Sequence, residues 1–405
     1  MKNDETIHIP EILLPKFHLD AEKMRKWSVI ACDQFTSDKD YWLSLDKEIG
    51  DAPSTLRLIY PEAFLSESEP EKRIEKINAE MEEYLRRGVF TRLDGGFIIT
   101  ERETEFRKEK RYGIMLAVDL EKYSYAPKSD AAIRASEATV PERLPPRIKI
   151  RRNAKIELPH VMLLYNAREE EIFGRFLSNN QLIGGDLVYD FDLNAHGGHL
   201  RGRYYGGDKA SEIADNLYRT AGEMLFAVGD GNHSLATAKK CWDEIKETLP
   251  ENERETHPAR FALCEAVSIY SPALVFEPIY RFVSGVDKEK FIAFIRTDKT
   301  HSSAYEKQNG VFAFDANDQV ELIRALDGKI AEYLKENGGE VDYIHGESAL
   351  FALSENGIGF LNGTVSKDGF FAEIVKNGSL PKKTFSMGEG REKRYYTECK
   401  MIALK

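Results

Sequence analysis

The chain lacks several features that would assign it to a protein class at once. It has only four cysteines in 405 residues. They are widely spaced, so we expect neither a zinc site of paired cysteines nor a disulfide framework. No uncharged apolar run approaches the length of a membrane span. Residues 1–6 are charged, with no apolar segment behind them, so no signal peptide is predicted. These absences favour a reduced, cytoplasmic protein that does not enter a membrane.

Three nucleotide-binding or catalytic signatures are also missing. No Gly-x-x-x-x-Gly-Lys-Ser/Thr segment occurs, which excludes a P-loop, and no Gly-x-Gly-x-x-Gly follows a strand, which leaves a Rossmann cofactor site unsupported. There is no Gly-x-Ser-x-Gly elbow. The net charge of −11 argues against a protein that binds nucleic acid through a broad basic face. An anion site must therefore come from a local cluster of charge.

Strand-like and helix-like segments alternate along the chain, with strands that are not uniformly separated by helices. This pattern predicts an α+β fold with a mixed sheet. Composition changes near residue 285, which predicts one domain over 1–285 and a C-terminal α/β region over 286–405. The predicted strands are 28–32, 55–60, 89–106, 111–120, 161–165, 187–193, 341–344 and 358–361. The predicted helices are 69–88, 288–296, 319–337 and 347–354.

The most informative segment is 229–234, in which two glycines flank an aspartate. The apolar run 225–228 before it predicts a buried strand, and good helix formers follow. A strand that turns directly into a helix presents backbone N–H groups and the positive end of the helix dipole, which suits a phosphate. Asp230 adds a ligand for Mg²⁺ or a proton acceptor. A simple turn without a ligand is the alternative. The residues expected to bind phosphate here are Gly229, Gly231, Asn232, His233 and Ser234.

A second segment, 133–152, is strongly basic although the chain is acidic. Arg147, Lys149 and Arg151 alternate with isoleucines, so on a strand they would line one face. Guanidinium groups at that spacing can hold a polyphosphate through bidentate hydrogen bonds. A solvated edge strand protected by its charges is the alternative. Arg134 and Arg143 lie among small residues and prolines, in a segment that we interpret as a loop that places side chains.

Three further segments carry polar side chains. Asp33 follows a predicted strand and is a candidate base or metal ligand, whereas Cys32 has no neighbouring base and is a weaker candidate nucleophile. Lys382 and Lys383 lie in a loop bounded by proline and glycine, which suits contact with an anion. The pair of histidines within 190–199 has metal-ligand spacing, but a plain hairpin is the favoured interpretation.

Taken together, these motifs resemble a family of bacterial and archaeal proteins. The family is known as domain of unknown function one-thousand-and-fifteen, also described as SerK-like, and the similarity runs over nearly the whole chain. The resemblance implies a ParB/sulfiredoxin-like nucleotide-binding core with large elaborations, a fold that also houses free L-serine kinases. The segments that carry it are 29–37, 51–57, 60–62, 134–147, 229–234 and 380–388.

The chain departs from the family pattern at its central turn. Asp230, Gly231 and His233 match the more common Asp-Gly-His-His-Arg form, in which the segment opens a helix and holds phosphates. Asn232 replaces the first histidine and Ser234 replaces the arginine. The second change removes a bidentate phosphate contact, so the resemblance leaves the substrate open.

A second family pattern, His-Glu-x-Thr, is matched in part. Glu137 and Thr139 carry over, and the histidine does not. Arg134, Arg143 or Arg147 could supply the positive charge that is lost at the central turn.

The resemblance implies a nucleotide-dependent kinase that acts on a hydroxyl of a small metabolite, such as free L-serine, with ATP or ADP as the donor and Mg²⁺. The residue types found in these segments independently indicate the same reaction, phosphoryl transfer. Asp230 would hold Mg²⁺ or take the hydroxyl proton, and Asp33, Glu62 and Glu137 are rival bases. The expected partners are a nucleotide and a small molecule, and a homodimer is compatible with this interpretation. The alternative is a nucleotide-binding regulatory protein or a family member without catalytic activity.

Overall fold

The computed structural model describes residues 6–139, 144–297 and 299–404, which form two compact units. The core unit consists of Met1–Leu274 and Glu389–Lys405, and the inserted unit is Val275–Gly388. This division differs from a single boundary near residue 285, because the end of the chain returns to the core unit. Short strands hold it there: β23 (Tyr395–Tyr396) pairs with β3 (Val29–Ile30), and β24 (Lys400–Met401) pairs with β9 (Ile156–Glu157).

The core unit is built on one large mixed sheet. Within the described residues this sheet has ten strands in the order β13-β14-β5-β6-β16-β10-β15-β8-β7, with β1 beside β6. Strand pairs β10/β16, β15/β8 and β7/β8 are parallel and the other pairs are antiparallel, which confirms the predicted α+β class. The strands are β1 (Ile7–His8), β5 (Gly96–Thr104), β6 (Arg107–Asp119), β7 (Tyr123–Ser124), β8 (Ile133–Ala135), β10 (Met162–Tyr165), β13 (Asp186–Asp192), β14 (His199–Gly206), β15 (Phe226–Asp230) and β16 (Phe261–Ser268).

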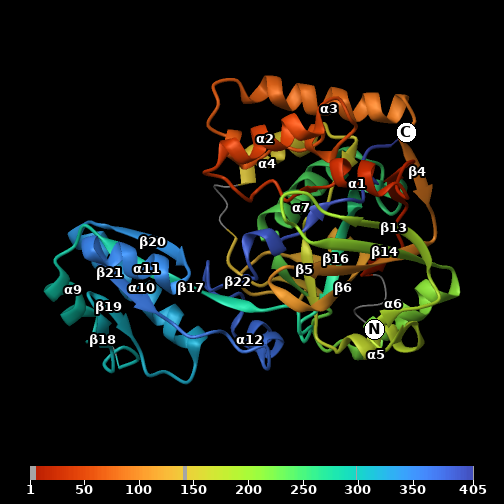
Figure 1. Ribbon diagram of the computed structural model, residues 1–405. Helices are drawn as coiled ribbons and strands as arrows, with labels where there is room; N and C mark the ends of the chain where they lie inside the picture. Colours follow the sequence, from red (N-terminus) through yellow and green to blue (C-terminus); the bar gives the residue numbers. More distant parts are fainter. Residues whose placement is uncertain (1–5, 140–143, 298, 405) are drawn as a thin grey trace. The chain divides into compact units, whose positions relative to one another are not determined.

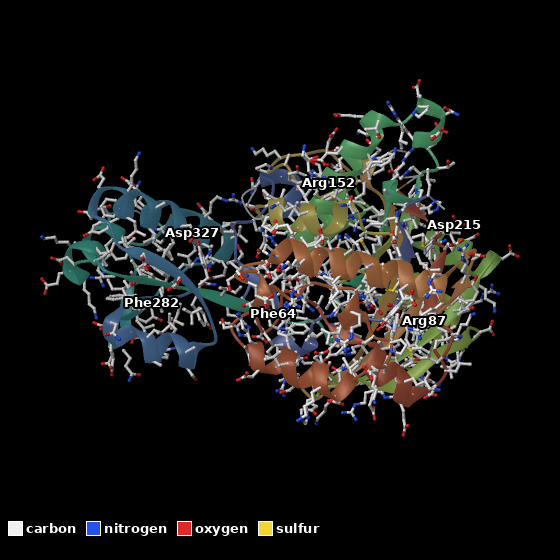
Figure 2. The ribbon with its side chains drawn as sticks, turned by 90° about the horizontal axis from the view of Figure 1, so that it is seen from above. Phe64, Arg87, Arg152, Asp215, Phe282 and Asp327 are labelled. Atoms are coloured by element: carbon white, nitrogen blue, oxygen red, sulfur yellow. The ribbon has the colours of Figure 1, made fainter. Side chains whose placement is uncertain are left out.

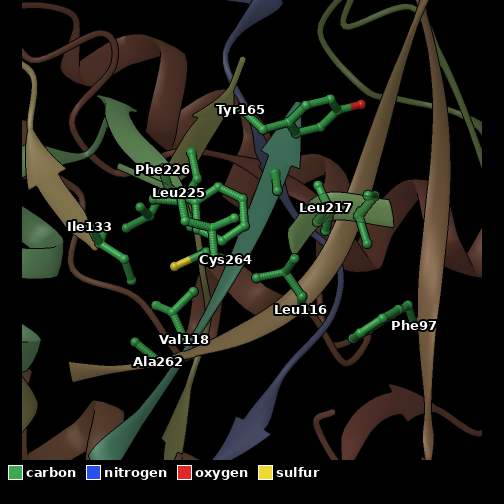
Figure 3. Packing of buried hydrophobic residues seen from close by; sticks show 14 of the residues in the cluster. Phe97, Leu116, Val118, Ile133, Tyr165, Leu217, Leu225, Phe226, Ala262 and Cys264 are labelled. Carbon is green, nitrogen blue, oxygen red and sulfur yellow. The ribbon is translucent and has the colours of Figure 1, made fainter. Parts of the chain in front are cut away.

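Both faces of this sheet are buried, because successive side chains of a strand point to opposite faces. Phe97 and Leu116 join one apolar cluster, packed with Leu217 of α6, whereas Ile98 and Met115 join a second cluster on the other face. Figure 3 shows the first cluster, and Figure 1 shows α1 to α3 on one side of the sheet and α6 on the other. The helices are α1 (Ala21–Trp27), α2 (Lys39–Ile49), α3 (Pro70–Arg86), α4 (Leu144–Arg152), α5 (Glu169–Phe173), α6 (Asp208–Thr220), α7 (Asn232–Thr248) and α8 (Glu251–Arg254).

The predicted strand over 55–60 is wrong, and so is the interpretation of the basic segment as a strand. Residues Thr55–Arg57 form a 3₁₀ turn, in which the N–H of Leu56 donates to the Ser54 side chain. The basic segment is helix α4 rather than a strand, with two prolines in its first turn, where a missing N–H costs nothing. The alternation of cations therefore does not place them on one face. Arg147 and Arg151 share a side of the helix at i and i+4, whereas Lys149 reaches Glu71 of α3.

The predicted helix over 69–88 is confirmed as α3, and the paired strands over 89–120 are confirmed in β4 (Phe90–Leu93), β5 and β6. Strand β4 pairs with β2 (Ile12–Pro15). A further hairpin joins β11 (Leu177–Ser178) and β12 (Gln181–Leu182).

The inserted unit has its own sheet and core. Its strands run in the order β18-β19-β21-β17-β20, and β22 also pairs with β17. Arg281 of β17 is fully buried and binds Asp327 of α10, labelled in Figure 2, through two hydrogen bonds of 2.8 Å. The three predicted helices of this region are confirmed. The elements are β17 (Phe276–Ser284), α9 (Lys288–Ile295), β18 (Tyr305–Gln308), β19 (Val311–Ala313), α10 (Gln319–Asn337), β20 (Glu340–His345), α11 (Glu347–Leu353), β21 (Gly357–Leu361), α12 (Phe370–Asn377) and β22 (Phe385–Met387).

Candidate functional site

The segment 229–234 forms the predicted strand, turn and helix. Strand β15 ends at Asp230, Gly231 is the N-cap in a left-handed conformation with φ of 79°, and α7 begins at Asn232. A Cβ atom at position 231 would lie 3.0 Å from the Cα of Val161. Both the backbone conformation and the close packing therefore require glycine here.

The carboxylate of Asp230 is held on both sides. Its Oδ1 accepts the N–H of Gly231 at 2.9 Å, and its Oδ2 pairs with Nζ of Lys393 at 3.1 Å. The N–H of Ser234 donates to the carbonyl of Gly231 at 2.9 Å. The expectation that the amides of this turn are open to a ligand is thus corrected at two positions, because a phosphate would have to displace Asp230 to reach the Gly231 amide. The turn does, however, have a cation beside it, because the mostly buried Lys393 pairs with Asp230.

Strand β8 brings a second predicted segment to the same edge of the sheet. It runs parallel to β15, with Ala135 opposite Val228, so Glu137 follows at the edge where Asp230 ends its strand. The Ser136 hydroxyl donates to the carbonyl of Val228 and ties the two segments together.

The other predicted residues of this segment are placed differently. Arg134 is buried, and its Nε donates to the carbonyl of Ala131 at 2.9 Å, so part of its guanidinium is used to hold its own turn. The hydroxyl of Thr139 is buried without a hydrogen-bond partner among the described residues. Arg143 lies outside the described residues.

Asp33, Glu62 and Arg147 meet beside the start of α7. Arg147 of α4 forms an ion pair with Glu62. The N–H of Glu62 donates to the carbonyl of Cys32 at 2.7 Å, which brings Glu62 to the segment that carries Asp33. Oδ2 of Asp33 lies 3.9 Å from Nε2 of His160. Residues from four distant parts of the sequence are thus gathered at one place.

His160 connects this group to α7. Its Nε2 is hydrogen bonded to Oγ of Ser234 at 2.9 Å, and its Nδ1 to the hydroxyl of Tyr396 at 2.7 Å. The Tyr396 hydroxyl also lies 3.1 Å from Sγ of Cys32 and accepts the N–H of Cys32 at 3.2 Å. His160 and Tyr396 are 8% and 2% exposed, so this chain of hydrogen bonds is shielded from water.

The environment shifts the pKa values of these groups in different directions. For Asp33, burial opposes ionisation, but the positive charge of the protonated form of His160 and a hydrogen bond from Gln34 outweigh it and lower the pKa. For Glu62, burial is the larger effect and raises the pKa despite the charge of Arg147. Burial also raises the pKa of the Cys32 thiol to about 12, so this cysteine is not a thiolate nucleophile at neutral pH.

A mainly apolar cavity of about 160 Å³ opens beside these residues. Its polar lining includes Ser234, His160 and two ion pairs, Glu62 with Arg147 and Glu157 with Arg151. The walls come from helices α3, α4 and α7 and from the turns that precede β10. The apolar lining includes Leu58, Ile59, Leu65, Met81, Ile150, Leu158, Val161, Leu235 and Ala238. A cavity with mainly apolar walls and a few polar groups is typical of a small-molecule site.

The carboxylates of the site are compatible with Mg²⁺ held jointly by protein and phosphate. Among the described residues, no three His, Cys, Asp or Glu side chains gather as a metal site. Mg²⁺ in nucleotide sites commonly takes only one or two carboxylates, with phosphate oxygens and waters completing its shell, and Asp230 can serve in that way. The segment 190–199 forms a hairpin, as favoured, in which Asp192 lies opposite His199.

Lys382 and Lys383 belong to the inserted unit. Their carbonyls accept hydrogen bonds from the buried guanidinium of Arg281 at 3.3 and 2.9 Å. The ammonium group of Lys382 lies 5.3 Å from the ring centre of Tyr343. Their role as anion ligands stays a prediction.

Sequence reasoning missed three residues of the site. Lys393 and Tyr396 come from the last segment of the chain, and His160 precedes the strand β10. A signal for the last segment exists: a lysine and an arginine stand beside two tyrosines in 393–396, and all four are buried. Buried cations need partners, but the sequence does not say which carboxylates provide them.

No helix among residues 6–139, 144–297 and 299–404 has both the length and the apolar composition of a membrane span. A search of curated proteins found no match. Among solved structures, a conserved hypothetical protein from Pyrococcus furiosus is 12% identical with a TM-score of 0.35, over 68% of this chain and 90% of that one. A free serine kinase in complex with AMP is 10% identical with a TM-score of 0.37, over 69% and 90%.

A free serine kinase variant in complex with ADP is 10% identical with a TM-score of 0.38, over 73% of this chain and 93% of that one. The sequence model of the proteins of unknown function called DUF1015 matches residues 13–344, which is most of the chain and includes the turn at Asp230. This chain is therefore a member of the DUF1015 family.

Proposed function

We propose that this protein is a nucleotide-dependent phosphotransferase that phosphorylates a hydroxyl of a small metabolite, with free L-serine as the first acceptor to test. One observation carries the proposal. The start of α7, Arg147 and Glu62 line one cavity, and Asp33 and Lys393 lie next to this group, since the charges of Lys393 and Arg147 both lower the pKa of Asp33. Phosphoryl transfer depends mainly on this combination of positioning and charge.

The turn at Asp230 is the proposed seat of the nucleotide phosphates. Lys393 supplies a cation next to the positive end of α7. Both the cation and the helix end favour the binding of an anion at this turn. Asp230 would hold Mg²⁺ together with phosphate oxygens. The metal would supply charge neutralisation for the transferred group. Lys393, left without its carboxylate partner, would then pair with phosphate instead.

The apolar cavity is the proposed seat of the nucleoside. Its walls are provided by aliphatic side chains such as Met81, Leu158 and Leu235. Ser234 of α7 and Arg147 of α4 also line this cavity. An apolar pocket that leads to a cluster of positive charge matches a base attached to a polyphosphate.

The directions of the pKa shifts support a division of roles between the competing carboxylates. A general base works best when its pKa lies near the working pH, and the raised pKa of Glu62 moves this group in that direction. The lowered pKa of Asp33 keeps it charged. Pairs of carboxylates with opposite shifts commonly divide the acid–base and electrostatic roles in this way. Glu62 is accordingly the proposed base for the acceptor hydroxyl, and Glu137 is its rival.

A regulatory protein that binds nucleotide without turnover is the second candidate. The ion pair between Asp230 and Lys393, and Ser234 in the place of an arginine in the family pattern, both reduce the number of groups ready for phosphate. Such a protein would show nucleotide binding and no product.

The test has two stages. First, thermal unfolding and calorimetric titration are measured with ATP, ADP, AMP, adenosine and tripolyphosphate, each with and without Mg²⁺, because a ligand of the native state raises its apparent stability. We expect ATP or ADP to bind more tightly than adenosine or tripolyphosphate alone. Second, product formation is followed with L-serine and a panel of hydroxyl metabolites. Absence of binding by every nucleotide would refute the proposal, and binding without any product would favour the regulatory protein.

A further inference from the structure

Ser234 and His160 form a pair that phosphate binding does not require. Oγ of Ser234 and Nε2 of His160 are 2.9 Å apart, and the second nitrogen of the imidazole is held by the Tyr396 hydroxyl at 2.7 Å. A hydroxyl within hydrogen-bond reach of a base, with the base oriented by a third group, is the geometric signature of an activated nucleophile. His160 and Tyr396 are almost fully buried, whereas Ser234 is partly exposed, and all three residues line the cavity.

The tautomer with its proton on Nδ1 completes the arrangement. Nδ1–H then donates to the oxygen of Tyr396, whose own proton is directed to Sγ of Cys32 at 3.1 Å. The lone pair of Nε2 faces the hydroxyl of Ser234. The carboxylate of Asp33, 3.9 Å from Nε2, stabilises the imidazolium that forms when the histidine takes a proton.

We propose that Ser234 is a nucleophile that accepts the phosphoryl group first and then passes it to the acceptor, so that transfer proceeds through a phosphoserine enzyme. This inference rests on the proposed function and deepens it. A single direct transfer needs only positioned substrates, whereas the Ser234–His160–Tyr396 chain gives the protein a nucleophile of its own.

The two half-reactions balance as follows. In the first, the bond between Oγ of Ser234 and the terminal phosphorus forms, the bond from that phosphorus to the bridging oxygen breaks, and the shortened nucleotide leaves with the electron pair. The proton of Ser234 moves to Nε2 of His160. In the second, the acceptor oxygen bonds to phosphorus and loses its proton to Glu62, and the serine oxygen leaves and takes its proton back from His160. Glu62 releases the proton to water.

The position of Ser234 suits a phosphorylated intermediate. It is the third residue of α7, a helix of 17 residues, where the dipole favours negative charge. Phosphoserine at a helix start gains charge-assisted hydrogen bonds when cations are near, and Arg147 lines the same cavity as Ser234.

The test looks for the intermediate directly. The protein is incubated with Mg²⁺ and with ATP or ADP labelled on the terminal phosphate, without acceptor, and is quenched with acid. We expect one phosphoryl group per chain, located on Ser234 by peptide mass spectrometry and discharged when the acceptor is added. Ser234→Ala should abolish the label. Ser211→Ala, the same truncation at an exposed serine of α6, should keep it.

Tyr396→Phe tests the positioning role of the third group. The ring stays and only the hydroxyl is lost, so we expect the rate of labelling to fall about tenfold and its pH profile to move, because His160 is no longer held in one tautomer. A purely structural Tyr396 would change stability and leave the pH profile in place. Thermal unfolding of Ser234→Ala at the wild-type temperature shows that the variant is folded.

The outcomes separate this inference from the proposed function. Nucleotide binding and product formation without a labelled protein would overturn the phosphoserine step and leave the phosphotransferase intact. Label on a residue other than Ser234 would also overturn it. A protein that binds none of the nucleotides would overturn both.

Discussion

The ammonium group of Lys393 lies 3.1 Å from the carboxylate of Asp230, so the last segment of the chain closes the turn at which α7 begins. The same ammonium also lowers the pKa of Asp33, after the larger effects of burial, His160 and Gln34. One lysine therefore acts on two of the carboxylates that the sequence singled out. Its removal is the most direct way to test whether this edge of the sheet binds an anion.

Lys393→Ala should weaken ATP binding by roughly ten- to hundredfold, because a charge-assisted hydrogen bond contributes about 1.5–3 kcal/mol. Calorimetric titration at constant salt measures the change. Lys108→Ala, at an exposed position of β6, is the control and should leave the affinity within about twofold. Equal effects of the two changes would contradict a specific phosphate contact.

Asp230→Ala should abolish Mg²⁺-dependent turnover while the fold stays intact, since the change removes the proposed metal carboxylate. Lys393 loses its partner in this variant, so binding of ATP without Mg²⁺ should be unchanged or tighter. Parallel titrations with and without Mg²⁺ distinguish the two effects. Normal turnover by this variant would remove Asp230 from the mechanism.

Glu62→Gln should lower kcat by about 10²–10⁴-fold, the usual contribution of a general base, with little change in nucleotide affinity. The sign of the pH dependence follows from its raised pKa. Because the active form is ionised, activity should rise with pH through that pKa, and this acidic limb should disappear in the variant. Glu137→Gln provides the comparison, and a larger loss there would make Glu137 the base.

Gly231→Ala should destabilise the protein by about 2 kcal/mol, because the residue has φ of 79° and its Cβ would meet Val161 at 3.0 Å. Nucleotide affinity should fall as well, since the start of α7 must shift. Gly222→Ala, where a Cβ meets nothing within 4 Å, is the matched control and should be close to neutral. Urea unfolding of both variants checks the difference.

Glu265→Gln tests the buried ion pair behind the site. Glu265 is 1% exposed, and its Oε2 lies 2.9 Å from Nη1 of Arg394. Breaking such a pair should cost about 3 kcal/mol at neutral pH. Burial raises the pKa of Glu265, but the charges of Arg394 and Arg111 outweigh it and lower the value.

A lowered folded-state pKa means that this stabilisation is present above the unfolded pKa of about 4.3 and is lost as the pH falls through the folded value. The free energy of unfolding of the wild-type protein should therefore no longer exceed that of the variant below about pH 4. Urea unfolding of both proteins, from neutral pH to below about pH 4, measures this difference in stability. A difference in stability that does not change with pH would show that Glu265 is not the titrating group.

Local patterns predicted those parts of the fold that depend on neighbours along the chain. The strand, turn and helix around Gly231 followed from an apolar run, two glycines and helix formers, and α3 followed from its helical spacing. The same reasoning gave the wrong element for 147–151. The alternation of cations and isoleucines suggested a strand, whereas the two preceding prolines are typical of the first turn of a helix. Packing of α4 against α7 then decided which arginines face the cavity.

The site could be predicted only in pieces. Asp33, Glu62, Arg147 and Ser234 were each named from their own segments, but nothing along the chain says that Arg147 pairs with Glu62. His160 and Tyr396 were missed because a single histidine and a single tyrosine are unremarkable in sequence. They acquire a role only when β23 pairs with β3 and carries Tyr396 to Cys32.

The sequence alone determined the family, the mixed α+β class and the turn before α7, because each depends on residue types within a short window of chain. Tertiary structure alone decided which charges meet at that turn, that the pKa of Asp33 is lowered and that of Glu62 raised, and that Ser234 faces a histidine. The physical reason is that hydrogen bonds and ion pairs act over a few ångströms in space, and only folding brings residues that are far apart in the chain within that range.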